Sequence, residues 1–315
     1  MLEPQRTNLL QRSNEFDNSY WDKVNVTVTA NSAISPDGTN NAFLLDVGTA
    51  NDDHSLRKEA LAPTSTYTVS IFAKKGSTDY VWFLCGANAK AVQAIFDLSD
   101  GSVTDSGTVG TGQTLVDAKS VDMGNGWYRL IIEAETTSAP QNNLTITPYY
   151  QSTFSGSIGT SWQGNNETIY IYGAMNEESS FATSYIPTSG STVTRSADVA
   201  NNSGNADLFN DSEGVLYAEI ASLAEGVGSK QFSISDGGGS NSIKFSFQTT
   251  ANRIKVTVAS NGTTTANFTK DISPAVTNFF KMALKYKVDD CALWINGTEV
   301  ATDTSAAMPL SLIHI

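Results

Sequence analysis

The chain has 315 residues, of which 40% are hydrophobic, and a formal net charge of −13. This length predicts two domains, and the hydrophobic content is enough to bury a core, which excludes a chain that is disordered throughout. The negative charge repels phosphate backbones, so nucleic acid is excluded as a partner, and no apolar run approaches the ~20 residues that a membrane helix needs.

Short stretches in which apolar and polar residues alternate, typical of half-buried β-strands, follow one another through the first part of the chain. The clearest is 67–74, in which Tyr67, Val69, Ile71 and Ala73 share one face. The strands that the sequence predicts in this part are 24–29, 42–46, 67–74, 81–85, 91–97, 129–135, 144–150 and 169–172. Short strands separated by turn residues are typical of a sandwich or jelly roll.

Small polar residues at 196–213 predict a linker or a peripheral strand, and a second strand-rich unit follows. Its strands are expected at 215–220, 230–235, 243–248, 253–259, 264–269, 279–286 and 291–295. The Asn-Gly pairs at 261–262 and 296–297 predict hairpin turns, because both residue types tolerate positive φ. Helix is nearly absent, and we expect only one helical turn, at 18–23.

Groups of residues that could carry catalysis are scarce. His54 is the one histidine outside the last six residues, so a histidine-based zinc site or a Ser–His–Asp triad cannot be assembled, and we expect His54 to lie solvated on a polar loop. The glycine-rich run 236–240 lies in a hairpin and not between a strand and a helix, which excludes a phosphate cradle. A glycosidase needs two carboxyl groups across a cleft, whereas Glu219 stands alone on its strand. The sequence therefore predicts no enzyme, and Cys85 and Cys291, in different predicted domains, are expected to be buried free thiols.

Aromatic residues are the best candidates for binding, because sugar rings dock their C–H faces on flat rings while amides and charged groups bind the hydroxyls. Trp82 lies on one face of strand 81–85, and Trp162 lies on a polar loop, where an exposed ring costs free energy unless it contacts something. Tyr149 and Tyr150 point to opposite faces of their strand, so one of them should meet solvent or a groove. Core packing is the competing interpretation of every aromatic residue in a strand. The predicted ligand-binding residues are Trp82, Trp162, Tyr149, Gln151, Gln93 and Arg129.

Three blocks in the first two thirds of the chain have specific patterns. Residues 169–198 read IYIYGAMNEESSFATSYIPTSGSTVTRSAD, residues 3–10 and 13–21 read EPQRTNLL and SNEFDNSYW, and residues 125–130 read NGWYRL. They resemble the closing segment, the opening and the start of one strand of a β-sandwich module that is common in bacteriophage tail and head fibre proteins. The resemblance implies that residues 1–195 form a carbohydrate-binding-like jelly roll with a concave, ligand-facing sheet.

A second resemblance lies at residues 280–300, which read FKMALKYKVDDCALWINGTEV. This run is similar to the central hairpin of concanavalin A-like (laminin-G-like) sandwiches, and it implies that residues 214–309 are a truncated domain of that kind, because further strands usually follow the hairpin. The predicted fold class is therefore all-β, with two β-sandwich (jelly-roll) domains in tandem, the second incomplete at its C-terminus. Residues 196–213 are the expected linker or peripheral strand. Residues 310–315 match a translated sequencing adapter, and we hypothesise that this metagenomic reading frame runs into adapter sequence.

The resemblances imply a structural protein of a virion fibre or tail, made in the bacterial cytoplasm. It would present non-catalytic sandwiches to bacterial cell-surface glycans and assemble with other fibre subunits, as a homotrimer by analogy with fibre proteins, so that multivalency strengthens weak sites. Two alternatives stay open: a purely architectural spacer without a ligand, and an accessory part of a polysaccharide-degrading enzyme whose catalytic domain lies outside this sequence.

No cofactor is expected, with the exception of one structural Ca²⁺. Jelly rolls similar to this module often hold such an ion through carboxylate and carbonyl oxygens. Asp46, Asp52 and Asp53 supply carboxylates, although no loop has a recognisable ligand spacing.

Overall fold

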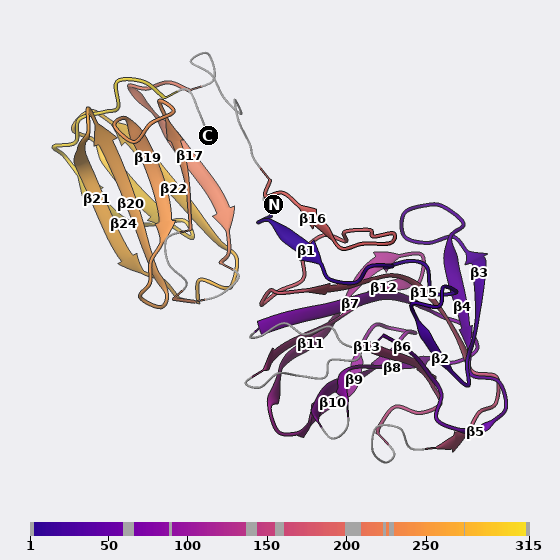
Figure 1. Ribbon diagram of the computed structural model, residues 1–315. Helices are drawn as coiled ribbons and strands as arrows, with labels where there is room; N and C mark the ends of the chain where they lie inside the picture. The colour runs from indigo at the N-terminus through magenta and orange to yellow at the C-terminus, as the bar shows by residue number, and fades with distance from the viewer. Residues whose placement is uncertain are drawn as a thin grey trace. The chain divides into compact units, whose positions relative to one another are not determined.

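The computed structural model describes residues 3–58, 66–87, 90–136, 144–154, 161–198, 209–222, 225–226, 230–273 and 275–312. The chain divides into two compact units, Met1–Asp198 and Val199–Ile315, each with its own sheets and core (Figure 1). The regular elements in the described ranges are all β-strands, and no helix there is long and apolar enough to cross a membrane. The predicted linker 196–213 falls partly on residues 199–208, which lie outside the described ranges.

The first unit is a sandwich of two six-stranded antiparallel sheets. In order across the first sheet, the strands are β10 (Val103–Gly110), β9 (Lys90–Asp97), β8 (Tyr80–Ala87), β13 (Leu144–Tyr149), β6 (Ser55–Lys58) and β2 (Asp22–Val24). Across the second sheet they are β11 (Gln113–Gly124), β12 (Trp127–Thr136), β7 (Thr66–Lys75), β15 (Thr168–Glu177), β4 (Ala42–Asp46) and β3 (Thr27–Ala33). Two short ladders pair β1 (Arg6–Asn8) with β16 (Val193–Arg195) and β5 (Asn51–Asp52) with β14 (Trp162–Gln163).

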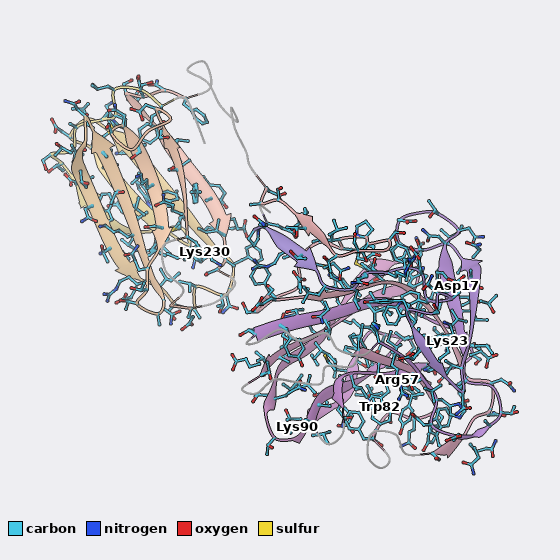
Figure 2. The ribbon with its side chains drawn as sticks, viewed as in Figure 1. Asp17, Lys23, Arg57, Trp82, Lys90 and Lys230 are labelled. Carbon is cyan, nitrogen blue, oxygen red and sulfur yellow. The ribbon has the colours of Figure 1, made fainter. Side chains whose placement is uncertain are left out.

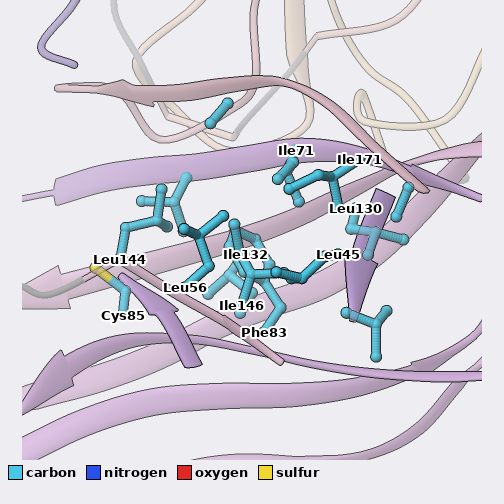
Figure 3. Packing of buried hydrophobic residues seen from close by; sticks show 14 of the residues in the cluster. Leu45, Leu56, Ile71, Phe83, Cys85, Leu130, Ile132, Leu144, Ile146 and Ile171 are labelled. Carbon is cyan, nitrogen blue, oxygen red and sulfur yellow. The ribbon is translucent and has the colours of Figure 1, made fainter. Parts of the chain in front are cut away.

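The core of the first unit lies between the two sheets, because successive side chains of a strand point to opposite faces. In β8 the inward residues are Val81, Phe83 and Cys85, and in β7 they are Tyr67, Val69, Ile71 and Ala73, as the sequence predicts. Figure 3 shows residues of both sheets, such as Phe83 and Ile132, meeting in this core. Cys85 is a buried free thiol, as predicted, and its burial raises the pKa of the thiol to about 12.

Near residue 25 the structure differs from the predicted elements. The predicted strand 24–29 is divided, because Asn25 has a φ of 47°, so that β2 ends at Val24 and β3 begins at Thr27 in the other sheet. A left-handed residue does not continue a β-ladder, and Asn tolerates this conformation better than most residues. The predicted helical turn at 18–23 is a non-helical turn that leads into β2. Two edge strands, β10 and β11, lie outside the predicted set, because their many Gly, Ser, Thr and Asp residues weaken the alternation.

The segment that follows β15 folds back over the outer face of the second sheet. There the ring of Tyr185 packs against Phe72 and Tyr172, with ring centroids 5.8 and 5.6 Å away. The Tyr185 hydroxyl also forms a 2.6 Å hydrogen bond with Ser13 Oγ, which joins the closing segment to the start of the chain. This face is therefore covered by the protein's own chain.

Arg129, one of the predicted ligand-binding residues, lies beneath this closing segment. Its guanidinium donates to Thr183 O at 2.6 Å and to Ser70 Oγ at 2.9 Å, and it lies over the ring of Phe72 at 5.5 Å. Glu177, fully buried, accepts hydrogen bonds from Thr183 N and Oγ1 at 2.9 and 2.8 Å. Burial lowers the pKa of Arg129 and raises that of Glu177, while the opposite charges of the two side chains act against both shifts. The donors of Arg129 thus bind the protein itself.

The second unit is a sandwich of two four-stranded antiparallel sheets. Their strands are β17 (Glu213–Ile220), β22 (Phe280–Lys287), β23 (Cys291–Ile295) and β24 (Thr298–Asp303) in one sheet, and β18 (Gln231–Ser235), β19 (Ser242–Phe247), β20 (Arg253–Ser260) and β21 (Thr263–Asp271) in the other. Every predicted strand of this unit has a counterpart. The Asn-Gly pairs at 261–262 and 296–297 both have two positive φ angles, the geometry of a type I′ turn. Residues of both sheets form the core, which includes the free thiol of Cys291 and the side chain of Leu312.

The turn at Asp37 ties the loop before β4 to the outer aromatic cluster. Asp37 Oδ1 accepts hydrogen bonds from Ser35 Oγ and from Thr39 N and Oγ1, and Oδ2 accepts from Asn41 Nδ2 and from Tyr172 Oη. Burial alone would raise the pKa of Asp37, but these hydrogen bonds outweigh it and hold the pKa well below its usual range. The carboxylate form therefore stabilises the turn.

We expect Arg129→Ala to lower the free energy of unfolding of the first unit by about 3 kcal/mol, because the Thr183 carbonyl and Ser70 lose their donor and buried Glu177 loses a nearby positive charge. Urea unfolding at neutral pH, followed by tryptophan fluorescence, measures the change. Arg253→Ala is the control, since it removes an exposed ion pair with Asp271 in the second unit and should cost less than about 1 kcal/mol. Equal losses in the two variants would contradict the buried role of Arg129.

Asp37→Asn should make the first unit less sensitive to acid. Because the folded-state pKa is lowered, the stabilisation by Asp37 is present above the unfolded value of about 3.9 and is lost as the pH falls through the folded pKa. The wild type should be more stable than Asp37→Asn at neutral pH, and the difference should shrink below about pH 4. Thermal unfolding of both proteins across this range measures it; a difference that is constant with pH would refute the prediction.

Candidate functional site

The outer face of the first sheet carries a second apolar cluster, separate from the core. It is formed by Trp82, Leu84, Ala91, Ile95 and Tyr149, against which Tyr80, Val109, Phe154 and Trp162 pack. Strand alternation explains its position: in β8, Trp82 and Leu84 point outward between the inward residues of the core. Trp82 is labelled in Figure 2, in the part of the first unit that holds β8 and β13.

Four rings of this cluster and the adjacent ring of Tyr150 form a continuous series of contacts. Trp82 lies 5.6 Å from Phe154 and 5.2 Å from Tyr149, measured between ring centroids, and Tyr149 lies 5.9 Å from Trp162. Tyr150 then lies 4.8 Å from Trp162 with an interplanar angle of only 32°. Contacts at these distances are typical of favourable aromatic pairs.

Two of the predicted binding rings form the buried floor of this cluster. The exposed fraction is 7% for Trp82 and 1% for Tyr149. Trp82 Nε1 donates to Gln93 Oε1 at 3.2 Å, and Gln93 is itself buried, so this amide orients the indole. Trp82, Tyr149 and Gln93 therefore lie together beneath other side chains.

The accessible part of the cluster is the rim pair, Tyr150 and Trp162. Tyr150 is 41% exposed and Trp162 is half-buried. The predicted strand 144–150 ends one residue earlier, at Tyr149, whose carbonyl accepts a hydrogen bond from Thr78 Oγ1. Tyr150 lies beyond the strand, and its ring contacts Trp162. Gln151 is half-buried beside the pair, and its Nε2 donates to Thr153 O at 2.7 Å.

Trp162 lies in a short ladder and not on an isolated loop. β14 pairs with β5 in the register Trp162–Asp52 and Gln163–Asn51. Gln163 Nε2 donates to Thr49 O at 2.6 Å, which further holds the strand in place. The main chain of Trp162 is thus fixed by a segment more than 100 positions earlier in the sequence.

Polar groups share the outer face with these rings. Arg57 of β6 is paired through Thr145 of β13 with Leu84 of β8, so all three point to the same side. Arg57 is half-buried, and its Nε has no hydrogen-bond partner among the described residues. Of the predicted donors, Gln93 is in register with Leu84 and therefore lies on this side of the sandwich. Gln151 follows Tyr150 on the same side, whereas Arg129 belongs to the other sheet.

His54 is not solvated, so the prediction for this residue is wrong. Its exposed fraction is 1%, and its ring packs edge-on against Trp162 at 4.8 Å. Nδ1 lies 2.9 Å from Asn25 O, and Nε2 lies 3.1 Å from Ala50 O and 3.3 Å from Trp162 O. Polar loops from three parts of the chain meet around the ring, and nothing in the local sequence indicates this burial.

The three aspartates that could hold calcium do not converge. In the described part of the chain, no group of three or more His, Cys, Asp or Glu side chains could hold a metal ion. Asp46 Oδ1 accepts a hydrogen bond from Gly48 N at 2.7 Å, and Asp53 pairs with Arg57 at 3.9 Å. These carboxylates stabilise loops next to the aromatic cluster.

No protein-family model matches the sequence, and no curated protein matches it. Among solved structures, the chain is similar to domains LG4-5 of the mouse laminin alpha1 chain, with a TM-score of 0.24 and 11% identity over 82% of this chain and 77% of that chain. It is also similar to the LG1-3 region of the laminin alpha2 chain, with a TM-score of 0.19 and 9% identity over 83% of this chain and 55% of that chain, about half of its length. The strand pairing itself shows the architecture, an all-β chain of two β-sandwiches in tandem.

Truncation of a buried floor residue and of an exposed rim residue should change the free energy of unfolding by different amounts. Trp82→Ala is expected to lower the free energy of unfolding by about 3–5 kcal/mol, because it opens a cavity under Phe154 and Tyr149. Tyr150→Ala should cost less than about 1 kcal/mol, since much of its ring is already in water. Urea unfolding of the two variants tests this, and similar losses would contradict the division into floor and rim.

Proposed function

We propose that the chain is a non-catalytic adhesion protein whose first unit binds glycans on the Tyr150–Trp162 rim pair. The observation that carries this proposal is a contacting pair of rings, tilted by 32°, in which Tyr150 is 41% exposed and Trp162 packs on Tyr149, which in turn packs on Trp82. A pyranose ring presents a flat C–H face that stacks on such a surface. A supported ring loses little conformational freedom on binding, which favours affinity.

Two glutamines adjoin the rim pair along the chain, and their amide oxygens can accept hydrogen bonds from sugar hydroxyls. The amide of Gln151 lies next to Tyr150 in the sequence, and Gln163 follows Trp162 in β14. The overall charge of −13 disfavours strongly anionic polysaccharides at long range. We therefore expect neutral or weakly charged chains to bind best.

The absence of catalysis is part of this proposal. Glycoside hydrolysis with retention needs two carboxyl groups about 5–5.5 Å apart. Asp105, in register with Ile95 of the cluster, accepts a hydrogen bond from Phe154 N at 3.0 Å. This carboxylate holds the segment that covers Trp82, which supports a structural role.

The biological setting follows from the resemblance to bacteriophage fibre modules. In that setting the partners are bacterial cell-surface glycans and further fibre subunits, with a homotrimer as the expected assembly, and the site acts on the virion. Several weak sites on one particle bind together, so millimolar single-site affinity is sufficient. The second candidate is an architectural spacer without a ligand, which the tightly packed floor of the cluster favours.

The test is binding of the full chain to purified bacterial surface polysaccharides, with and without calcium, by titration calorimetry and by co-sedimentation with cells. Tyr150→Ala should weaken binding about threefold to tenfold, as expected for loss of one stacked ring. Phe279→Ala is the matched control, because Phe279 is an aromatic residue of the second unit that is 70% exposed. A folded chain that binds nothing at millimolar sugar would favour the spacer, and equal effects of the two variants would place the site elsewhere.

A further inference from the structure

His54 joins three segments that are distant in the sequence. It precedes β6, and its ring nitrogens reach Asn25 O, between β2 and β3, Ala50 O, before β5, and Trp162 O in β14. The ring is 1% exposed, so water does not substitute for these contacts. One side chain therefore sets the distances between three loops at the edge of the aromatic cluster.

The partners of His54 are all hydrogen-bond acceptors. A carbonyl oxygen accepts and cannot donate, whereas a neutral imidazole has one N–H donor and one bare nitrogen. In the neutral form one of the two nitrogens has no proton. If it is Nδ1, it faces Asn25 O with no hydrogen bond; if it is Nε2, it faces Ala50 O and Trp162 O with none. The imidazolium donates on both sides, so it is the form that fits this geometry.

The contacts of His54 reach the binding surface through Trp162. The imidazole contacts both the carbonyl and the indole of Trp162, and the indole stacks on Tyr150. Gly164 closes the same loop: its N–H donates to Ala50 O at 2.9 Å, and a Cβ at this position would lie 2.7 Å from Gly48 O and 3.3 Å from His54 Cε1. The position of Trp162 therefore depends on the imidazole and on the loop packed around it.

Charged side chains of both signs lie near the ring. Asp53 is adjacent in the chain and interacts electrostatically with His54, and Arg57 and Asp52 interact with Asp53 in turn. Burial raises the pKa of Asp53, while the charges of Arg57 and His54 act in the opposite direction. The ring also contacts the segments at Asn25 and at Trp162–Gly164, and the residues at these positions have no titratable side chain.

We propose that His54 is the positioning residue of the rim pair, and that as an imidazolium it holds Trp162 in the geometry that binds a glycan. The expected effect on glycan binding rests on the proposed function, whereas the role in holding Trp162 rests on the contacts of His54. A side chain with a donor on one side only would lose the hydrogen bond to one of the three loops and would release the loop that carries Trp162. Replacement of His54 by such a side chain therefore weakens glycan binding.

The first experiment needs no ligand. In the full chain with His314→Gln, His54 is the only imidazole, and its ring ¹⁵N shifts report whether each nitrogen carries a proton. We expect both nitrogens to carry a proton in the folded chain, and the Trp162 indole signal to move when His54→Gln removes the second donor. Trp162→Phe identifies that signal among the five tryptophans. One bare nitrogen, or an indole signal that His54→Gln leaves in place, would overturn the proposal.

The second experiment measures affinity for each polysaccharide that binds in the panel above. His54→Gln keeps a single donor group and should bind about tenfold more weakly than wild type, which corresponds to one charge-assisted hydrogen bond. Tyr150→Ala should also bind more weakly, but without a change in the protonation of the His54 ring. Equal affinities of wild type and His54→Gln would overturn the positioning role. If no polysaccharide binds, the proposed function fails, and the ring shifts alone decide the role of His54.

Discussion

Both six-stranded sheets of the first unit carry apolar side chains on their two faces, and this constraint determines much of the rest of the structure. The inner faces pack against each other and form the core. Each outer face must then be covered in some other way, because exposed apolar strands would associate with other molecules. The chain covers the two outer faces differently, and the difference decides where a ligand can bind.

The outer face of the second sheet is closed by the segment after β15. Tyr185 packs on Phe72 and Tyr172, and Arg129 binds the carbonyl of Thr183. A charged residue that looks like a ligand-binding donor in the sequence is used here to hold one segment of the protein against another. Buried charges are tolerated where they are hydrogen-bonded, as Arg129 and Glu177 are.

The outer face of the first sheet is covered mainly by aromatic rings, which leave part of their surface accessible. Trp82 and Tyr149 are covered by Phe154, Tyr150 and Trp162, of which Tyr150 is the most exposed. A ring that is supported from below is more rigid than a ring on an isolated loop, so the packing that removes Trp82 from solvent also prepares the surface above it. Burial of the floor and exposure of the rim thus belong to one arrangement. His54 adds a polar link to it, because backbone carbonyls of three loops lie around its imidazole.

The sequence by itself determined the fold class, most strands and the hairpin turns, because these depend on local alternation and on the φ preferences of Asn and Gly. It also named Trp82, Gln93 and Tyr149 as candidates for ligand binding, and the strand pairing then placed them on one sheet. Only the tertiary structure decided that Trp82 lies in the buried floor of the outer aromatic cluster and Tyr150 at its exposed rim. It also decided that Arg129 lies under the closing segment and that His54 is buried. Each of these depends on which distant segment covers a residue, and periodicity along a strand gives the face of a side chain without saying what lies above it.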